Sequence, residues 1–178
     1  MNGDANVCNY DESTNTGTKQ NTAACAVLTT NITVNSKLVE NLNADGTVKN
    51  GYDVTNWTPI GGYYNSKLVD YSGTFDGNGK TISGLYYYYN ETIDSSKETI
   101  RVYAGLFGSN TGTIKNVVVE DSYIKIDCDG IRTCYVGGLC GFNKGTIENS
   151  DNASTVSVTD TTQPYTLRSV NFWVSSNA

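Results

Sequence analysis

The chain of 178 residues contains no histidine, only two prolines and a single methionine. Without histidine, the Ser-His and Cys-His pairs that activate a nucleophile in many hydrolases are excluded. The five cysteines include no Cys-x-x-Cys pair, and this lack, together with the lack of histidine, argues against a zinc site. These absences remove several common classes of enzyme before any motif is considered.

Charge and long apolar runs are also scarce. The net charge is −6, and like charges do not cluster anywhere in the sequence. Nucleic acids and anionic membranes both require basic patches, so neither is expected as a partner. No apolar segment is long enough to cross a bilayer, so we expect no membrane insertion by this segment. The N-terminal "MNGDANVCNYDE" lacks the features of a signal peptide, and the composition favours a fragment of a secreted protein.

Asn, Thr, Ser and Gly are abundant instead, and tyrosine outnumbers the other aromatic residues. Asn, Ser and Gly favour turns, whereas Thr, Val, Ile and Tyr favour strands. No window has the period of a capped amphipathic helix. The composition therefore predicts one all-β domain of short strands joined by tight turns.

Two related stretches repeat along the chain, "AGLFGSNTGTIKNVVVE" at 104–120 and "GGLCGFNKGTIENSDNA" at 137–153. A weaker copy, "GNGKTISGLYYY" at 77–88, places Ile82 32 residues before Ile114. The positions shared by the two strong copies are 33 residues apart. They are Gly105 and Gly138, Leu106 and Leu139, Gly108 and Gly141, Ile114 and Ile147, and Asn116 and Asn149.

A fixed period of this length is typical of stacked architectures, in which each repeat buries its apolar side against the next. We predict a right-handed parallel β-helix, a solenoid, over residues 26–178, with repeats near 71–103, 104–136 and 137–170. Residues 1–25 form an irregular N-terminal leader or cap. In this stack Ile82, Ile114 and Ile147 lie over one another, and Asn116 and Asn149 occupy equivalent corners. A β-sandwich with an internal duplication is the alternative.

The cysteines allow two pairings. Cys8 and Cys25 can close an N-terminal loop, and Cys128 and Cys134 can staple the turn-rich "DGIRT" between them. Either disulfide would imply an oxidising compartment, and the alternative is that the thiols are reduced. Cys140 aligns with Phe107 in the repeat and is expected to point inward as a small buried hydrophobe.

The strong copies resemble the GLUG repeat of bacterial surface proteins. "NWTPIGG" at 56–62 and "YSGTFDGNGKTISGLYY" at 71–87 are similar to the segment that often precedes those repeats. The resemblance covers about residues 26–160. It implies a parallel β-helix on or outside a bacterial cell that acts as a stalk or display scaffold.

A run of four tyrosines suggests a binding surface. In a strand, two of the residues 86–89 face inward and two face outward. The outward pair can join other aromatic residues in a platform for sugar rings or for a protein partner. The alternative is that these rings pack against a neighbouring loop. The candidate ligand-binding residues are Trp57, Tyr63, Tyr64, Tyr86, Tyr87, Tyr88 and Tyr89.

Acidic residues offer weaker candidates. Asp127 and Asp129 can share a Ca²⁺ ion, but the later ligands of a calcium loop are missing, so turn chemistry is the favoured interpretation and no cofactor is assigned. "GTFDGNGKT" at 73–81 lacks the spacing and the following helix of a phosphate loop. A polysaccharide lyase or hydrolase would have to use carboxylates and basic residues from one strand and loop. These are Glu120, Asp121, Lys125 and Arg132.

The sequence therefore predicts a non-catalytic scaffold at a bacterial cell surface or outside the cell. Its expected partner is a host or environmental glycan or protein. Two other functions stay open. One is a polysaccharide-degrading β-helix enzyme that uses a long groove, and the other is a structural subunit whose ends associate into filaments.

Overall fold

The computed structural model describes residues 20–64, 67–90, 101–127, 133–159 and 169–170. The protein is all-β, with parallel sheets and a single short 3₁₀ turn in this part of the chain. The elements are β1 (Ala26–Val27), β2 (Ile32–Thr33), η1 (Val39–Asn41), β3 (Gly62–Tyr64), β4 (Lys67–Val69), β5 (Thr74–Ser83), β6 (Tyr86–Tyr89), β7 (Arg101–Ala104), β8 (Phe107–Asn110), β9 (Thr113–Asp127), β10 (Thr133–Val136), β11 (Cys140–Asn143), β12 (Thr146–Glu148), β13 (Asp151–Thr159) and β14 (Ser169–Val170).

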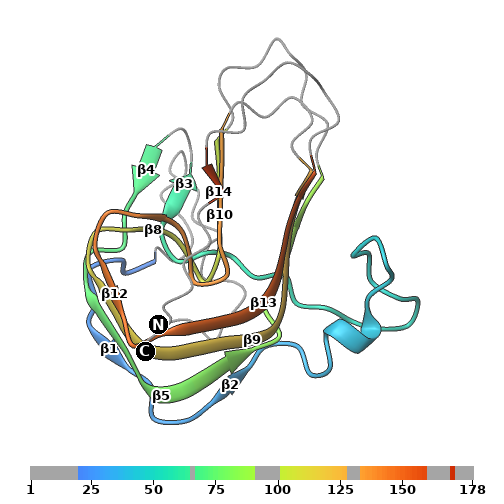
Figure 1. Cartoon of the computed structure of the whole chain (residues 1–178), viewed down its shortest axis with the longest axis horizontal. Coiled ribbons are helices and arrows are strands. Elements are labelled where there is room, and N and C mark those ends of the chain that lie inside the picture. The colour runs from blue at the N-terminus through green and yellow to red at the C-terminus, as the bar shows by residue number, and fades with distance from the viewer. Residues whose placement is uncertain (1–19, 65–66, 91–100, 128–132, 160–168, 171–178) are drawn as a thin grey trace, which may run out of the picture.

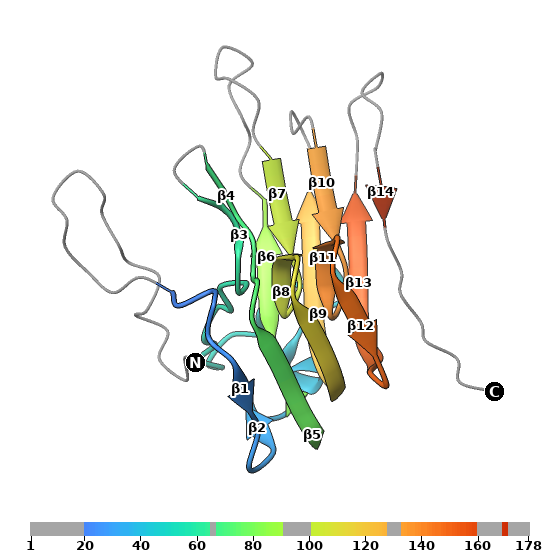
Figure 2. The same ribbon diagram turned by 90° about the vertical axis from the view of Figure 1, so that its left-hand side faces the viewer.

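The largest sheet is parallel throughout. Its path is β1-β5-β9-β12, and β2 pairs with β5 while β6 and β13 pair with β9. Figure 1 shows β5, β9 and β13 superposed along the line of sight, and Figure 2 shows them side by side. The predicted all-β class and the parallel pairing of strands are confirmed.

Two smaller parallel sheets follow the same repeat. β14, β10 and β7 form one sheet, and β11 and β8 form another. We call the strand sets β5–β7, β8–β10 and β11–β14 the first, second and third layers. Ile147 lies opposite Ile114, and Cys140 lies opposite Phe107, so the second and third layers are in the register that the 33-residue repeat predicted.

The register predicted for the first layer is wrong. Ile82 lies opposite Val119, and the residue opposite Ile114 is Phe75. The cause is a register shift in β5 between Asp76 and Lys80, where a bulge adds residues that β9 does not have. The first layer therefore aligns through the Gly-Thr-Phe that begins at residue 73, which matches the Gly-Thr-Ile of the later layers.

An inserted hairpin separates the first layer from the other two. Ile60 pairs with Phe107 and Tyr71 pairs with Asn110, so these two residues occupy the ends of the position that β8 fills in the second layer. Between them lies the antiparallel pair β3–β4. This insertion explains why the first layer lacks the Gly-Leu-x-Gly half of the repeat.

The interior holds two apolar clusters, and Cys140 lies in the first of them. Its side chain is 3% exposed, which confirms that it points inward, and burial raises the pKa of its thiol to about 12. Both clusters take their residues from successive layers. The first contains Phe75, Leu106, Phe107, Ile114, Val117, Val119, Leu139 and Cys140, and the second contains Val102, Ala104, Ile124, Ile126, Cys134 and Val136.

Close backbone approach between layers requires glycine at one recurring position. A Cβ atom on Gly112 would overlap the carbonyl oxygen of Gly73, and one on Gly145 would overlap that of Gly112. These glycines begin the Gly-Thr-Phe and Gly-Thr-Ile stretches. The repeat thus preserves both an inward apolar side chain and the room that the neighbouring layer needs.

Asn116 and Asn149 occupy equivalent corners, as predicted, with left-handed φ angles of 55° and 47°. Asparagine tolerates this region of backbone space better than most residues. The amide of Asn116 donates to the carboxylate of Asp76 at 2.9 Å, and the backbone N–H of Asn78 donates to the same oxygen. These hydrogen bonds, with that from Asn116 contributing most, lower the pKa of Asp76.

The segment 34–55 lies outside the sheets, against β6 and β9, on the right of Figure 1. Leu38 and Leu42 are buried there with Tyr86. The side chain of Asn35 is buried and bonds to the backbone of Gly84 and Thr55, which fixes the base of the segment.

The cysteine pairings find no support. Cys25 is an exposed free thiol, so the structure does not contain the predicted bond to Cys8, which lies outside the described residues. Cys134 is buried in the second cluster, and its predicted partner Cys128 also lies outside the described residues. An oxidising compartment therefore stays a prediction.

Candidate functional site

The four tyrosines of β6 alternate between two faces, as expected for a strand. Tyr87 and Tyr89 pack against the second interior cluster. Tyr86 and Tyr88 face the segment 34–55 and pack in its apolar cluster. The hydroxyl of Tyr86 donates to the carbonyl oxygen of Gly46 at 3.0 Å. Both faces of β6 are thus covered, one by the interior and the other by a loop.

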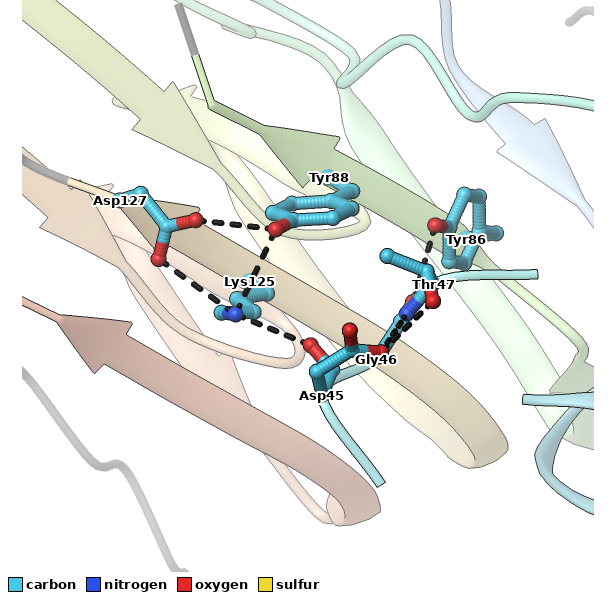
Figure 3. Close-up of polar contacts among 7 residues, drawn as sticks. All are labelled: Asp45, Gly46, Thr47, Tyr86, Tyr88, Lys125 and Asp127. Atoms are coloured by element: carbon cyan, nitrogen blue, oxygen red, sulfur yellow. Dashed lines mark hydrogen bonds and ion pairs between the residues drawn. The ribbon is translucent and has the colours of Figure 1, made fainter. Parts of the chain in front are cut away.

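Figure 3 shows the polar contacts that hold this loop to β9. The ammonium group of Lys125 donates to the backbone carbonyl of Asp45 at 2.9 Å. It also lies 3.5 Å from the carboxylate of Asp127 and 4.8 Å from the centroid of the Tyr88 ring. The Tyr88 hydroxyl donates to Asp127 at 3.0 Å, so one cation ties a loop, a tyrosine and a carboxylate together.

This cluster contains two of the residues considered for catalysis or calcium binding. Partial burial disfavours the charge of Lys125, but its contacts with Tyr88 and Asp127 outweigh that effect and raise its pKa. A protonated lysine is a cation rather than a general base at neutral pH. Glu120 and Asp121 are exposed at a corner of β9, away from these contacts. Arg132 and Asp129 lie outside the described residues.

Trp57 and Tyr64 are half-buried and bonded to the backbone. The indole N–H of Trp57 donates to the carbonyl oxygen of Gly105 at 3.1 Å, and its ring packs against the first interior cluster. The hydroxyl of Tyr64 donates to the carbonyl oxygens of Pro59 and Gly61. The seven aromatic residues named from the sequence therefore do not form one platform.

A different set of rings forms a continuous strip. Tyr63 stacks on Tyr103 with 6.3 Å between ring centroids, and Tyr103 lies 4.7 Å from Tyr135. Phe142 follows at 4.6 Å from Tyr135. We call these four residues the aromatic strip. Tyr63 belongs to the inserted hairpin, and the other three come from β7, β10 and β11, so the strip spans all three layers.

Strand alternation places the strip on the outside. In β7, Val102 and Ala104 point into the second cluster, so Tyr103 between them points outward. Tyr135 lies opposite Tyr103 in the parallel pair β7–β10. Tyr103 is only 7% exposed because its neighbours in the strip cover it, and burial raises its pKa. The other three rings are half-buried and retain accessible surface.

Sequence reasoning had named only Tyr63 from the strip. A usable signal was present, since Tyr103 and Tyr135 each stand two residues before the glycine that opens a repeat copy, at 105 and 137. Phe142 aligns with Ser109 and so had no aromatic partner in the repeat.

Charged groups lie at the strip. The guanidinium carbon of Arg101 lies 5.7 Å from the centroid of the Tyr63 ring, and the ammonium of Lys144 lies 4.9 Å from that of Phe142. Asp70 accepts a hydrogen bond from the hydroxyl of Ser109 at 2.5 Å. The strip therefore has a cation near each end and a carboxylate beside it.

Within the described ranges, no three acidic, cysteine or histidine side chains lie close enough to hold a metal ion. The carboxylate of Asp127 is engaged by Tyr88 and Lys125 instead. The same part of the chain contains no helix of the length and apolarity needed to cross a membrane.

Comparison with known proteins gives one distant similarity. Halomucin of Haloquadratum walsbyi is 32% identical over 126 residues, which make up 69% of this chain and 1% of halomucin. The chain thus spans about one hundredth of the length of that relative. No protein-family model matches the chain, so the resemblance to the GLUG repeat stays a prediction. No solved structure matches it.

Proposed function

We propose that this chain is a non-catalytic repeat scaffold of a cell-surface or secreted protein and that it displays the aromatic strip as a binding surface. The similarity to halomucin is compatible with a surface or secreted location. The observation that supports binding most directly is the strip itself, because four rings from the hairpin and all three layers line up on the outside.

The proposal includes the finer description of the fold, a right-handed parallel β-helix built from GLUG-like repeats. In-register pairing of β8 with β11 and of β9 with β12 and β13 supports it, as does the glycine position at 73, 112 and 145. Such a stack is stiff because each layer is hydrogen-bonded to the next along its strands. A stiff rod is suited to hold binding residues at a fixed distance from a cell.

The test is to incubate the purified protein with plant, host and bacterial polysaccharides and to record retention and new chain ends in one assay. Retention without new chain ends is expected, and Tyr135→Ala is expected to reduce it. Lys115→Gln, a change at the distant Asp76 corner, serves as the matched control. New chain ends would overturn the non-catalytic scaffold, and the absence of any retention would overturn the binding surface.

One arrangement favours the alternative of a polysaccharide-degrading enzyme. Lys125, Tyr88 and Asp127 lie within hydrogen-bonding or ion-pairing distance of one another, and a lyase or hydrolase needs such a mixture of acidic and basic groups. If new chain ends were found, Asp127→Asn would be the first variant to examine. Its loss of cleavage with unchanged retention would assign the reaction to this cluster.

Another arrangement favours end-to-end assembly. Among the described strands, β13 pairs with β9 and with no other, and Val156 and Val158 on it are only partly buried. An unpaired strand edge can receive a strand from a second copy. Sedimentation that stays monomeric over a wide range of concentrations would exclude this function.

A further inference from the structure

Positive charge lies at the aromatic strip although the chain as a whole is acidic. Arg101 and Lys144 are both exposed and lie over the rings of Tyr63 and Phe142, near the two ends of the strip. The net charge of the chain is −6. The two cations therefore give the strip a different electrostatic character from that of the remaining surface.

Aromatic rings and flanking cations together suit one class of ligand. The C–H faces of a pyranose ring pack on aromatic side chains, which bury apolar area at little cost in conformational freedom. Guanidinium and ammonium groups form charge-assisted hydrogen bonds with carboxylates and sulfates. We propose that the strip binds an acidic polysaccharide, with uronate or sulfate groups on Arg101 and Lys144 and sugar faces on Tyr135 and Phe142. This proposal rests on the function proposed above.

The repeat along the strip favours a polymer over a small sugar. Tyr103 and Tyr135 occupy equivalent positions in adjacent parallel strands. Neighbouring strands are about 4.8 Å apart, so the layers present similar groups at regular short intervals. A chain of repeated units can place successive units against successive layers, whereas a monosaccharide would contact only part of the strip.

Nucleic acid is the less suitable polyanion. Single strands also stack on aromatic residues, but their binding needs a continuous basic track along the backbone. The strip has one cation near each end, and the Asp70 carboxylate lies close enough to Tyr103 to help raise its pKa, after burial and Tyr135. A polymer with widely spaced charges suits this pattern better than one with a phosphate on every unit.

Asp70 provides a variant that should improve binding. Its carboxylate repels an anionic ligand at the strip, while its contact with Ser109 needs only an acceptor oxygen. Asp70→Asn keeps an oxygen for the Ser109 hydroxyl and removes the charge. We therefore expect this variant to bind acidic polysaccharides more tightly and neutral ones with the same affinity.

The experiment measures affinity for polygalacturonate and chondroitin sulfate, with amylose and xyloglucan as neutral probes. Wild type is expected to prefer the acidic probes and to lose that preference at high salt. Arg101→Gln and Lys144→Gln should each weaken binding of the acidic probes about fivefold, near the upper limit for an exposed ion pair. Lys115→Gln should change nothing. All four substitutions lie at exposed or partly exposed positions, and thermal melting checks that each variant folds.

The outcomes separate this proposal from the proposed function. Retention of neutral and acidic probes alike, without an effect of the charge variants, would overturn the acidic ligand and leave a binding scaffold. Equal affinity for poly-glutamate or for a single-stranded RNA would overturn a polysaccharide as the ligand. No retention of any probe would overturn the binding surface itself. Tighter binding of acidic probes by Asp70→Asn, with weaker binding by the two cation variants, would support the proposal.

Discussion

The side-chain amide of Asn110 donates a hydrogen bond to the amide oxygen of Asn143, 33 residues later in the chain, at 2.7 Å. Asn110 is fully buried, and its oxygen also accepts the backbone N–H of Gly112 at 3.0 Å. Asn143 makes the same local contact with Gly145. Each asparagine thus satisfies the turn of its own layer while it links that layer to the next.

We expect Asn110→Ala to destabilise the protein by about 1–3 kcal/mol, because a buried N–H loses its acceptor and Asn143 loses its donor. Urea denaturation followed by circular dichroism measures the change. Asn90→Ala, at an exposed position after β6, is the control and should stay within about 0.5 kcal/mol of wild type. Equal stability of the two variants would show that the link between layers contributes nothing.

Gly112→Ala should be more damaging. The added methyl group would overlap the carbonyl oxygen of Gly73, and backbone cannot move aside as a flexible side chain can. We expect a loss of about 2 kcal/mol or more, in the range for overpacked interior sites. Gly79→Asn is the matched control, since nothing lies near a Cβ there and asparagine tolerates its φ of 68°. A melting temperature for Gly112→Ala equal to that of the control would contradict the packing argument.

The repeat in the sequence predicted the pairing of Ile114 with Ile147 because the second and third layers have the same number of residues between equivalent positions. It failed for Ile82 because the bulge after Asp76 changes that number in the first layer. Spacing alone does not reveal a bulge. The Gly-Thr-Phe at residues 73–75 was the better guide, since the close approach of backbones requires glycine at that point.

The candidate binding residues were harder to predict. Alternation along β6 was visible in the sequence, but the covering of Tyr86 and Tyr88 depends on where the segment 34–55 packs. That contact joins residues about 40 positions apart, as in the bond from Tyr86 to Gly46. The strip has the opposite history, because Tyr103 and Tyr135 become neighbours only when parallel strands pair in register.

Lys125→Met should loosen the loop around Asp45 without unfolding the sheets. The change removes the donor to the Asp45 carbonyl and the partner of Asp127, while the remaining side chain still packs on Tyr88. These contacts are partly exposed, so we expect a loss of about 1 kcal/mol or less in global stability. Hydrogen exchange of residues 43–47 should become faster. Unchanged exchange there would mean that the backbone bonds of the turn suffice, and Lys115→Gln again serves as the control.

Stability should fall at alkaline pH because several acidic groups are buried in the neutral form. Burial raises the pKa of Cys140 and that of Tyr71 from 9.0 and 10.0 to about 12, and it also raises the pKa values of Tyr86 and Tyr103. The unfolded chain ionises these groups at their ordinary values, so the unfolded state gains free energy first as the pH rises. The stability that they contribute is fully present below pH 9 and is lost between about pH 9 and pH 12.

Urea midpoints at pH 8, 10 and 11 measure this loss, and the midpoint should fall at each step. Tyr71→Phe should start from a lower midpoint at pH 8, because the Tyr71 hydroxyl donates to the carbonyl oxygen of Ala24 at 2.8 Å. Its decline with pH should nevertheless be shallower, since one buried ionisable group is gone. A variant that declined as steeply as wild type would show that Tyr71 ionises alike in both states, and that the alkaline loss comes from Cys140 and the other tyrosines.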